Sequence, residues 1–333
     1  MKKIISFALA LILALSMSTV AFAANNQDAS FNKTYKITNE GTSNPAETFT
    51  FTFTADRVTD SNNNLGVANM PAIANSTISY DAGTATVAGL QKAVSVALSN
   101  VTWPGVGVYY YQVKETSGNT AGVTYDSATA YLKVTVAYDE GTNTYYTAFV
   151  TLNLADENGD GITDNKTGGF TNEYSAGSLS IKKIVTGNMG DQSAYFAVKV
   201  KLIGEADKTY LDSYSVTGGS NEKNPSTIAI DTETTFYLKH DDTIIISNLP
   251  YGVTYTVVED DYTTQEKGAY EEADYKFSDT AQKIDSASDT VQITNTKKTT
   301  VDTGINMDSM PYILLLAVAF VGLFVFISKK REF

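Results

Sequence analysis

The chain has 333 residues, no cysteine, one histidine and a formal net charge of −13 at pH 7. The lack of cysteine excludes thiol nucleophiles, disulfides, zinc knuckles and iron–sulfur sites, and a single histidine excludes histidine-rich metal centres. The acidic balance argues against a nucleic-acid partner, which needs clustered lysine and arginine. The length and the hydrophobic content of 43% suit two packed domains.

The N-terminus has the composition of a secretory signal. Two lysines precede an apolar stretch from Ile4 to Leu15, and Ala21-Phe22-Ala23 places small residues at a cleavage position. The apolar stretch is short for a membrane span, which disfavours an uncleaved anchor. We predict a signal peptide over residues 1–23 and an exported protein.

The C-terminus combines three features. Ser309–Ser328 carries no charge and is long enough to cross the hydrocarbon layer as a helix, and Lys329-Lys330-Arg331 follows at once. The pair Thr303-Gly304 stands upstream. This layout resembles the sorting signal of cell-wall-anchored proteins of Gram-positive bacteria, in which a sortase cuts between Thr and Gly. The resemblance implies a signal over residues 301–333 with linkage through Thr303. The Leu and Pro of the common signal are missing, which points to a dedicated sortase.

Between the two ends, short alternating runs rich in Thr, Val, Tyr and Phe are separated by Gly, Asn and Asp clusters, which is typical of strands and turns. We predict strands at Phe49–Phe53, Val108–Val113, Tyr131–Ala137, Tyr145–Leu152, Leu179–Val185, Thr243–Ile246 and Val253–Val258. The spacing favours an all-β protein of two antiparallel sandwiches. With Ser175–Ser178 as the linker, the predicted domains cover residues 24–175 and 176–300.

The two halves repeat one plan. Each begins with a lysine-bearing strand, continues with a strand that follows a proline-containing turn and ends on glutamate, and closes on a Thr-Asn pair. Because side chains alternate along a strand, one lysine in each half shares a face with apolar residues. The alternation predicts that six polar side chains point inward: Lys33, Glu115 and Asn172 in the first half, and Lys183, Glu259 and Asn295 in the second. Asp261 shares the alternation of Glu259 and is a second candidate for the acid.

Charged groups on a core face are costly, so they must be neutralised or react. Burial favours the free amine of a lysine, which is nucleophilic, and the protonated acid of a glutamate. An acid beside an asparagine can polarise the amide, the amine can attack, and ammonia leaves. Each triplet therefore predicts an uncharged Lys–Asn isopeptide bond. The alternative is a buried Lys–Glu ion pair with a neighbouring asparagine, and the repetition in both halves favours the bond.

The two triplets and the Thr-Gly signal resemble the shaft pilins of streptococci and related Gram-positive bacteria, whose tandem immunoglobulin-like (Cna-B-type) domains carry such bonds. The resemblance implies that Lys33 bonds Asn172 under Glu115, and that Lys183 bonds Asn295 under Glu259. It also implies a structural subunit rather than an enzyme, without a cofactor, that is polymerised by a sortase and fixed to peptidoglycan or to a base pilin. A tip adhesin is a further possible partner.

Polymerisation needs an exposed lysine on the next subunit. In the resembling pilins this lysine lies shortly before the asparagine of the first domain, where Lys166 is the only lysine. The alternatives are that Lys166 is an ordinary loop lysine and that the protein is a monomeric wall-anchored adhesin. The acidic segment 156–164 imitates the start of a calcium loop, but its twelfth position would be Thr167 instead of glutamate, so a polar hairpin tip is favoured and no metal site is predicted.

Overall fold

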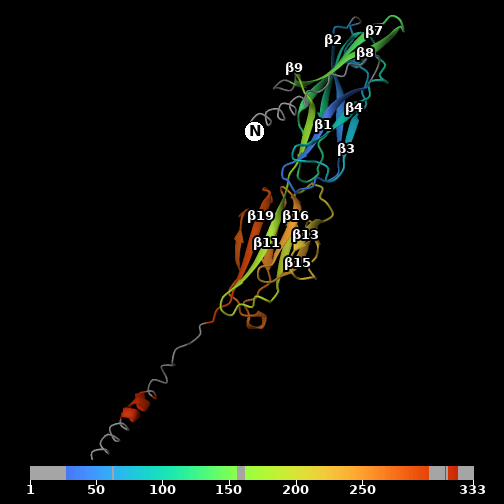
Figure 1. Ribbon diagram of the computed structural model, residues 1–333. Coiled ribbons are helices and arrows are strands. Elements are labelled where there is room, and N and C mark those ends of the chain that lie inside the picture. Colours follow the sequence, from blue (N-terminus) through green and yellow to red (C-terminus); the bar gives the residue numbers. More distant parts are fainter. Residues whose placement is uncertain (1–27, 62–63, 156–161, 300–311, 313, 322–333) are drawn as a thin grey trace, which may run out of the picture.

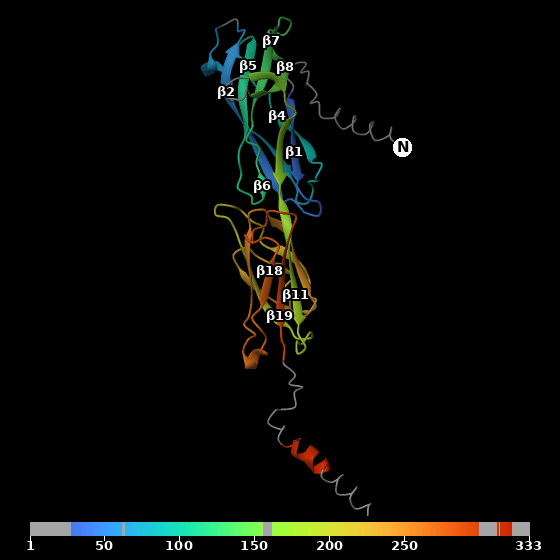
Figure 2. The same cartoon turned by 90° about the vertical axis from the view of Figure 1, so that its left-hand side faces the viewer.

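The computed structural model describes residues 28–61, 64–155, 162–299, 312 and 314–321, with the side chains of 162–165 left out. The described strands form two sandwich units that lie end to end in both side views (Figure 1, Figure 2). Every run predicted as a strand lies in or overlaps a strand of the structure, so the all-β prediction is confirmed.

The first unit contains two sheets facing each other. Their strands are β1 (Ala29–Ile37), β2 (Glu47–Thr59), β3 (Ser76–Tyr80), β4 (Leu90–Val96), β5 (Gly107–Glu115), β6 (Val123–Thr124), β7 (Thr129–Asp139), β8 (Thr144–Ala155), β9 (Ile162–Lys166) and β10 (Gly169–Tyr174). One sheet has the order β4-β1-β10-β6 and the other β3-β2-β5-β7-β8-β9. A 3-10 turn, η1 (Val67–Asn69), follows β2.

The second unit repeats this design. Its strands are β11 (Ala176–Thr186), β12 (Phe196–Ile203), β13 (Tyr214–Gly218), β14 (Thr227–Ile228), β15 (Glu233–Leu238), β16 (Thr243–Pro250), β17 (Thr254–Glu259), β18 (Asp274–Phe277) and β19 (Ser288–Thr296). The sheet orders are β14-β13-β16-β11-β19-β18 and β15-β12-β17. A 3-10 turn, η2 (Gln265–Lys267), lies between β17 and β18.

Aromatic residues fill the space between the sheets of the first unit. The Phe31 ring on β1 packs edge-on against Phe51 on β2 with 5.0 Å between centroids, and Tyr35 packs against Phe49 at 5.1 Å. These residues alternate with outward-facing neighbours along each strand, as a strand with one buried face requires. The packing brings the inward face of β1 against the opposite sheet.

In both units the first strand lies beside the last strand, and the two run parallel. Lys33 on β1 is paired with Phe170 on β10, and Tyr35 with Asn172. Lys183 on β11 is paired with Ile293 on β19, and Val185 with Asn295. Each asparagine therefore lies two residues beyond the pairing position of its lysine and on the same face of the sheet. The parallel pair brings the ends of each unit's sequence together.

Short polar contacts join the two units. Asn39 Nδ2 donates to the Ala176 carbonyl at 2.8 Å and to the Tyr251 hydroxyl at 2.7 Å. Asn248 Oδ1 accepts from the Ser43 amide at 2.8 Å, and its Nδ2 donates to the Ser43 carbonyl at 2.9 Å. The reciprocal amide contacts fix how the second unit meets the first.

Several predicted segments lie outside the described residues. These are the signal peptide at 1–23, the cleavage pair Thr303-Gly304, the core of the acidic loop at 156–161 and most of the apolar segment Ser309–Ser328. Residues 312 and 314–321 of that segment are helical. A search of the described residues finds no helix with the length and hydropathy needed to cross a membrane.

Candidate functional site

The six side chains predicted to point inward are all buried. In the first unit Lys33 and Asn172 are fully enclosed and Glu115 is 8% exposed. In the second unit Lys183 is fully enclosed, and Glu259 and Asn295 are at most 7% exposed. The alternation of exposed and buried residues along β1, β5, β10, β11, β17 and β19 accounts for this placement and confirms the inward orientation.

The first triplet is assembled from both sheets. Lys33 and Asn172 come from the neighbouring strands β1 and β10, and Glu115 reaches them from the end of β5 in the facing sheet. Lys33 Nζ lies 2.5 Å from Glu115 Oε2, and Asn172 Nδ2 donates to Glu115 Oε1. One carboxyl group thus contacts both the amine and the amide nitrogen.

The second triplet has the same origin in the fold. Lys183 and Asn295 lie on the parallel strands β11 and β19, and Glu259 reaches them from the end of β17 in the facing sheet. Lys183 Nζ donates to Asn295 Oδ1 at 2.6 Å and lies 3.1 Å from Glu259 Oε1. The amine and the amide are in direct contact here, with the acid beside them.

Burial controls the protonation of both triplets. It lowers the pKa of Lys33 and raises the pKa of Glu115, and the hydrogen bond between the two groups acts against both shifts. It likewise lowers the pKa of Lys183 and raises the pKa of Glu259. Both environments therefore favour a neutral amine beside a neutral acid, which is the state in which the amine is a nucleophile.

Aromatic rings surround the amines, a feature that strand alternation did not single out. Lys33 Nζ lies 4.6 Å from the centroid of the Phe49 ring, and Lys183 Nζ lies 4.5 Å from that of Phe196. The rings exclude water and supply the apolar surroundings that shift the two pKa values. The alternation of Phe49–Phe53 indicated that aromatic rings point into the core of the first unit. It did not indicate which lysine amine those rings would contact.

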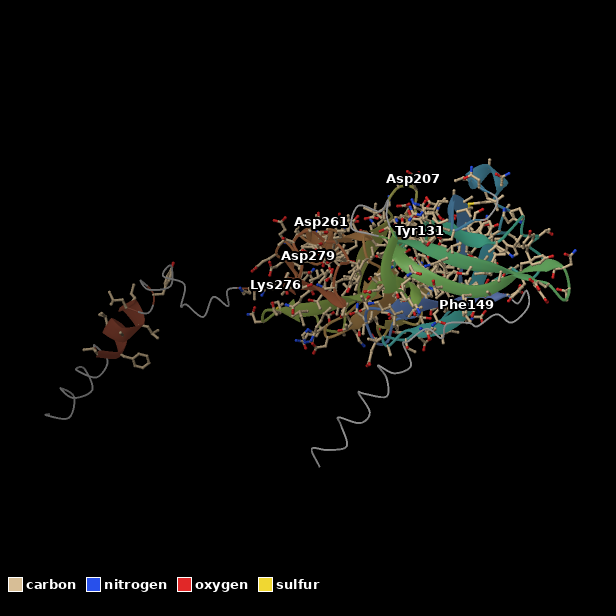
Figure 3. The ribbon with its side chains drawn as sticks, turned by 90° about the horizontal axis from the view of Figure 1, so that it is seen from above. Tyr131, Phe149, Asp207, Asp261, Lys276 and Asp279 are labelled. Carbon is tan, nitrogen blue, oxygen red and sulfur yellow. The ribbon has the colours of Figure 1, made fainter. Side chains whose placement is uncertain are left out.

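The structure places the remaining candidates away from the triplets. Asp261 follows the end of β17, is exposed, and accepts hydrogen bonds from the Thr263 amide and hydroxyl; Figure 3 shows it at the edge of the second unit. Lys166 is exposed and is the last residue of β9, a strand that Figure 1 labels in the half of the first unit remote from the second. Within the described ranges, no group of three or more histidine or carboxylate side chains is arranged to hold a metal ion.

A pocket of about 450 Å³ opens beside the second triplet. Glu259 and Asn295 contribute to its wall, together with Tyr275 and the carboxylates of Glu271 and Glu272. The pocket lies next to the triplet, but the carboxylate oxygens of Glu259 are themselves enclosed and Asn295 is 1% exposed.

Comparison with known families matches each unit separately. Residues 29–175 match the family model described as a Spy0128-like isopeptide containing domain, and residues 177–297 match a domain of unknown function. The chain is 29% identical over 325 residues to a pilin of Streptococcus pyogenes serotype M1, covering 92% of both chains. Over most of its length the chain is therefore similar to the shaft pilins of Gram-positive bacteria, and its first unit matches an isopeptide-containing domain family.

Solved structures agree with this assignment. The major pilin protein T3.2 of Streptococcus pyogenes serotype GAS13637 is 27% identical and superposes with a TM-score of 0.56, covering 83% of this chain and all of the other. The crystal structure of the major pilin from Streptococcus pyogenes has the same coverage, 22% identity and a TM-score of 0.54. The two sandwiches are accordingly immunoglobulin-like, and this pilin is a structural subunit rather than an enzyme.

Proposed function

We propose that this pilin locks each of its two units with one internal isopeptide bond, Lys33–Asn172 and Lys183–Asn295. The observation that carries the proposal is that two buried Lys–Glu–Asn triplets occur in the same strand register in both units. An ordinary buried ion pair would not need an asparagine at the same offset in each unit.

The reaction is an amidation that releases ammonia. The uncharged Nζ attacks Cγ of the asparagine, a C–N bond forms, and the bond between Cγ and Nδ2 breaks. The glutamate accepts a proton from Nζ and delivers one to Nδ2, so that the leaving group is neutral ammonia and the acid is regenerated. The contacts of Glu115 with both nitrogens suit this transfer.

Intact-mass measurement of the exported chain tests the bonds. The unsubstituted protein is expected to lack two ammonia molecules relative to its sequence. Glu115→Ala should restore one, and Glu115→Ala with Glu259→Ala should restore both, because the proton carrier is lost. Asp261→Ala is the matched control and should leave both bonds intact. A full, unmodified mass for the unsubstituted protein would refute the proposal.

We further propose that a sortase joins these subunits head to tail into a surface fibre. Cleavage after Thr303 would form an acyl-enzyme, and Lys166 of the next subunit would accept the threonyl group. The exposure of Lys166 and the place of its strand β9, in the half of the first unit remote from the second, support this choice. The fibre would then be fixed to peptidoglycan or to a base pilin and could carry a tip adhesin.

Boiled cell-wall extracts test the polymer. A ladder of covalent multimers is expected from the unsubstituted protein, and Lys166→Ala should reduce it to a single band. Lys133→Ala, which removes another lysine of the same sheet, should leave the ladder unchanged. A single band from the unsubstituted protein would instead favour a monomeric wall-anchored adhesin.

A further inference from the structure

The amide of Asn172 is held at both of its polar atoms. Its Nδ2 donates to Glu115 Oε1, and its Oδ1 accepts a hydrogen bond of 2.8 Å from the backbone N–H of Asp126. Asp126 lies in the short segment between β6 and β7, outside the Lys–Glu–Asn triplet. The carbonyl oxygen of the amide that is attacked therefore already faces a backbone donor.

The side chain of Asp126 fixes this donor in place. Its Oδ2 accepts from the Thr171 amide at 2.8 Å, and its Oδ1 accepts from the Ala128 amide at 2.9 Å. Thr171 directly precedes Asn172 on β10. The main chain and the side chain of one residue are thus attached to two consecutive residues of the strand that carries the reacting amide.

We propose that Asp126 is the positioning residue of the first crosslink, holding its own backbone N–H where the negative charge develops on Asn172 Oδ1. The inference rests on the proposed isopeptide bond. When Lys33 Nζ attacks Cγ, the carbonyl π-bond opens and its electron pair moves to Oδ1. A donor already aimed at that oxygen stabilises the tetrahedral intermediate without reorganisation. The intermediate then collapses, re-forming the carbonyl and expelling ammonia.

The second unit lacks this arrangement in the described residues. Asn295 Oδ1 accepts from Lys183 Nζ, and no backbone N–H of the described segments donates to it. The second crosslink is therefore an internal control in the same molecule, because a change at Asp126 should not alter it.

The charge of Asp126 acts on both partners of the reaction. Burial is the main cause that lowers the pKa of Lys33 and raises the pKa of Glu115, and the Asp126 carboxylate raises both pKa values. Loss of the charge would therefore favour the free amine of Lys33 but also the ionised form of Glu115. Asp126→Ala and Asp126→Asn both remove the charge, so a slower reaction in Asp126→Ala than in Asp126→Asn reports the loss of positioning.

The experiment follows both bonds during cell-free synthesis of the full chain, with crosslinked peptides quantified by mass spectrometry over time. Asp126→Ala keeps the backbone N–H but no longer holds it in place. It is therefore expected to slow the Lys33–Asn172 bond by about tenfold, less than the roughly hundredfold or more of losing an oxyanion donor outright, and to leave the Lys183–Asn295 bond unchanged. Asp126→Asn keeps one acceptor oxygen and should be intermediate. Asp139→Ala removes a carboxylate from another turn of the same unit and should form both bonds at the unsubstituted rate.

Folding is checked against Glu115→Ala, which should have a folded first unit without its bond, by comparing Trp103 fluorescence and thermal unfolding. If Asp126→Ala does not fold, the rate at which Asp126→Asn forms the Lys33–Asn172 bond tests the inference. Formation of the first bond at the unsubstituted rate in a folded Asp126 variant overturns the inference. Absence of both bonds from the unsubstituted protein instead contradicts the proposed function, so the two failures are distinguishable.

Discussion

The buried charged residues of this pilin do not all have a way to lose their charge. In each triplet the proposed amide would remove the charge of the lysine and leave the glutamate beside it as a neutral acid. Asp289 on β19 is also buried, at 3% exposure, but it lies outside the triplets and accepts a hydrogen bond of 2.9 Å from the Ser286 hydroxyl. Its carboxyl group must remain a titratable group inside the second unit.

Burial raises the pKa of Asp289 above the ordinary value of 3.8, and the Ser286 hydrogen bond acts against this shift. The folded state therefore favours the protonated acid. The stability that this group contributes is present below pH 3.8 and is lost as the pH rises through the raised pKa. Asp289 thus destabilises the second unit at neutral pH.

Asp289→Asn should raise the stability of the second unit at pH 7 by about 1 kcal/mol, because an uncharged side chain of the same shape replaces a buried carboxylate. The gain should vanish as the pH falls below 3.8. Calorimetric unfolding across this pH range measures it. Asp212→Asn changes an exposed carboxylate of the same unit and should have no effect. A gain that does not depend on pH would contradict the assignment.

Among the elements, the parallel contact between β1 and β10 is the one on which the first triplet depends. The two strands lie close together at Gly169, where the backbone has φ +140° and an added Cβ would lie 1.6 Å from the Asn32 carbonyl oxygen. Any side chain at this position would force β10 away from β1. The distance between the amine of Lys33 and the amide of Asn172 would then increase.

Gly169→Ala is therefore expected to lower the melting temperature of the first unit and to prevent or greatly slow its bond. Gly41→Ala is the matched control, because Gly41 also has a positive φ, at +83°, but faces open space. It should cost only about 1 kcal/mol of backbone strain and leave the bond intact. Calorimetry and intact mass report the two effects. Full crosslinking in Gly169→Ala would show that the strands tolerate separation.

At the scale of the whole molecule, the two proposed bonds and the proposed linkage sites define the path of a pulling force. Tension entering at Lys166 would pass along β10 into β11, cross from Lys183 to Asn295, and leave toward Thr303. Most of the first unit lies outside this path. The Lys33–Asn172 bond of the first unit would keep β10 attached to β1, whereas the Lys183–Asn295 bond of the second unit would bear the load directly.

Single-molecule stretching separates the two roles. With attachment at residue 166 and the C-terminus, Glu259→Ala should release the 112-residue segment between Lys183 and Asn295, an extension on the order of 350 Å. Glu115→Ala should add little length in this geometry, but should permit extension of the first unit when it is pulled from residue 28. Equal extension of both variants from residue 166 would contradict this force path.

The amino-acid sequence by itself determined the all-β fold and the six inward-facing side chains. Both follow from local chemistry, because strand alternation repeats every two residues and needs no knowledge of neighbouring strands. The repeated order of lysine, glutamate and asparagine then indicated the chemistry. The inward orientation of each side chain could be predicted one strand at a time, and the repeated order could be read along the chain.

The tertiary structure decided which groups meet. Alternation placed Asp261 with Glu259, but β17 ends at Glu259, so the rule no longer holds at Asp261 and that side chain turns to solvent. The parallel register that brings each asparagine to its lysine depends on pairing between distant segments. The Asp126 donor comes from a backbone N–H, a group that every residue except proline carries, so only its position in the folded chain distinguishes it.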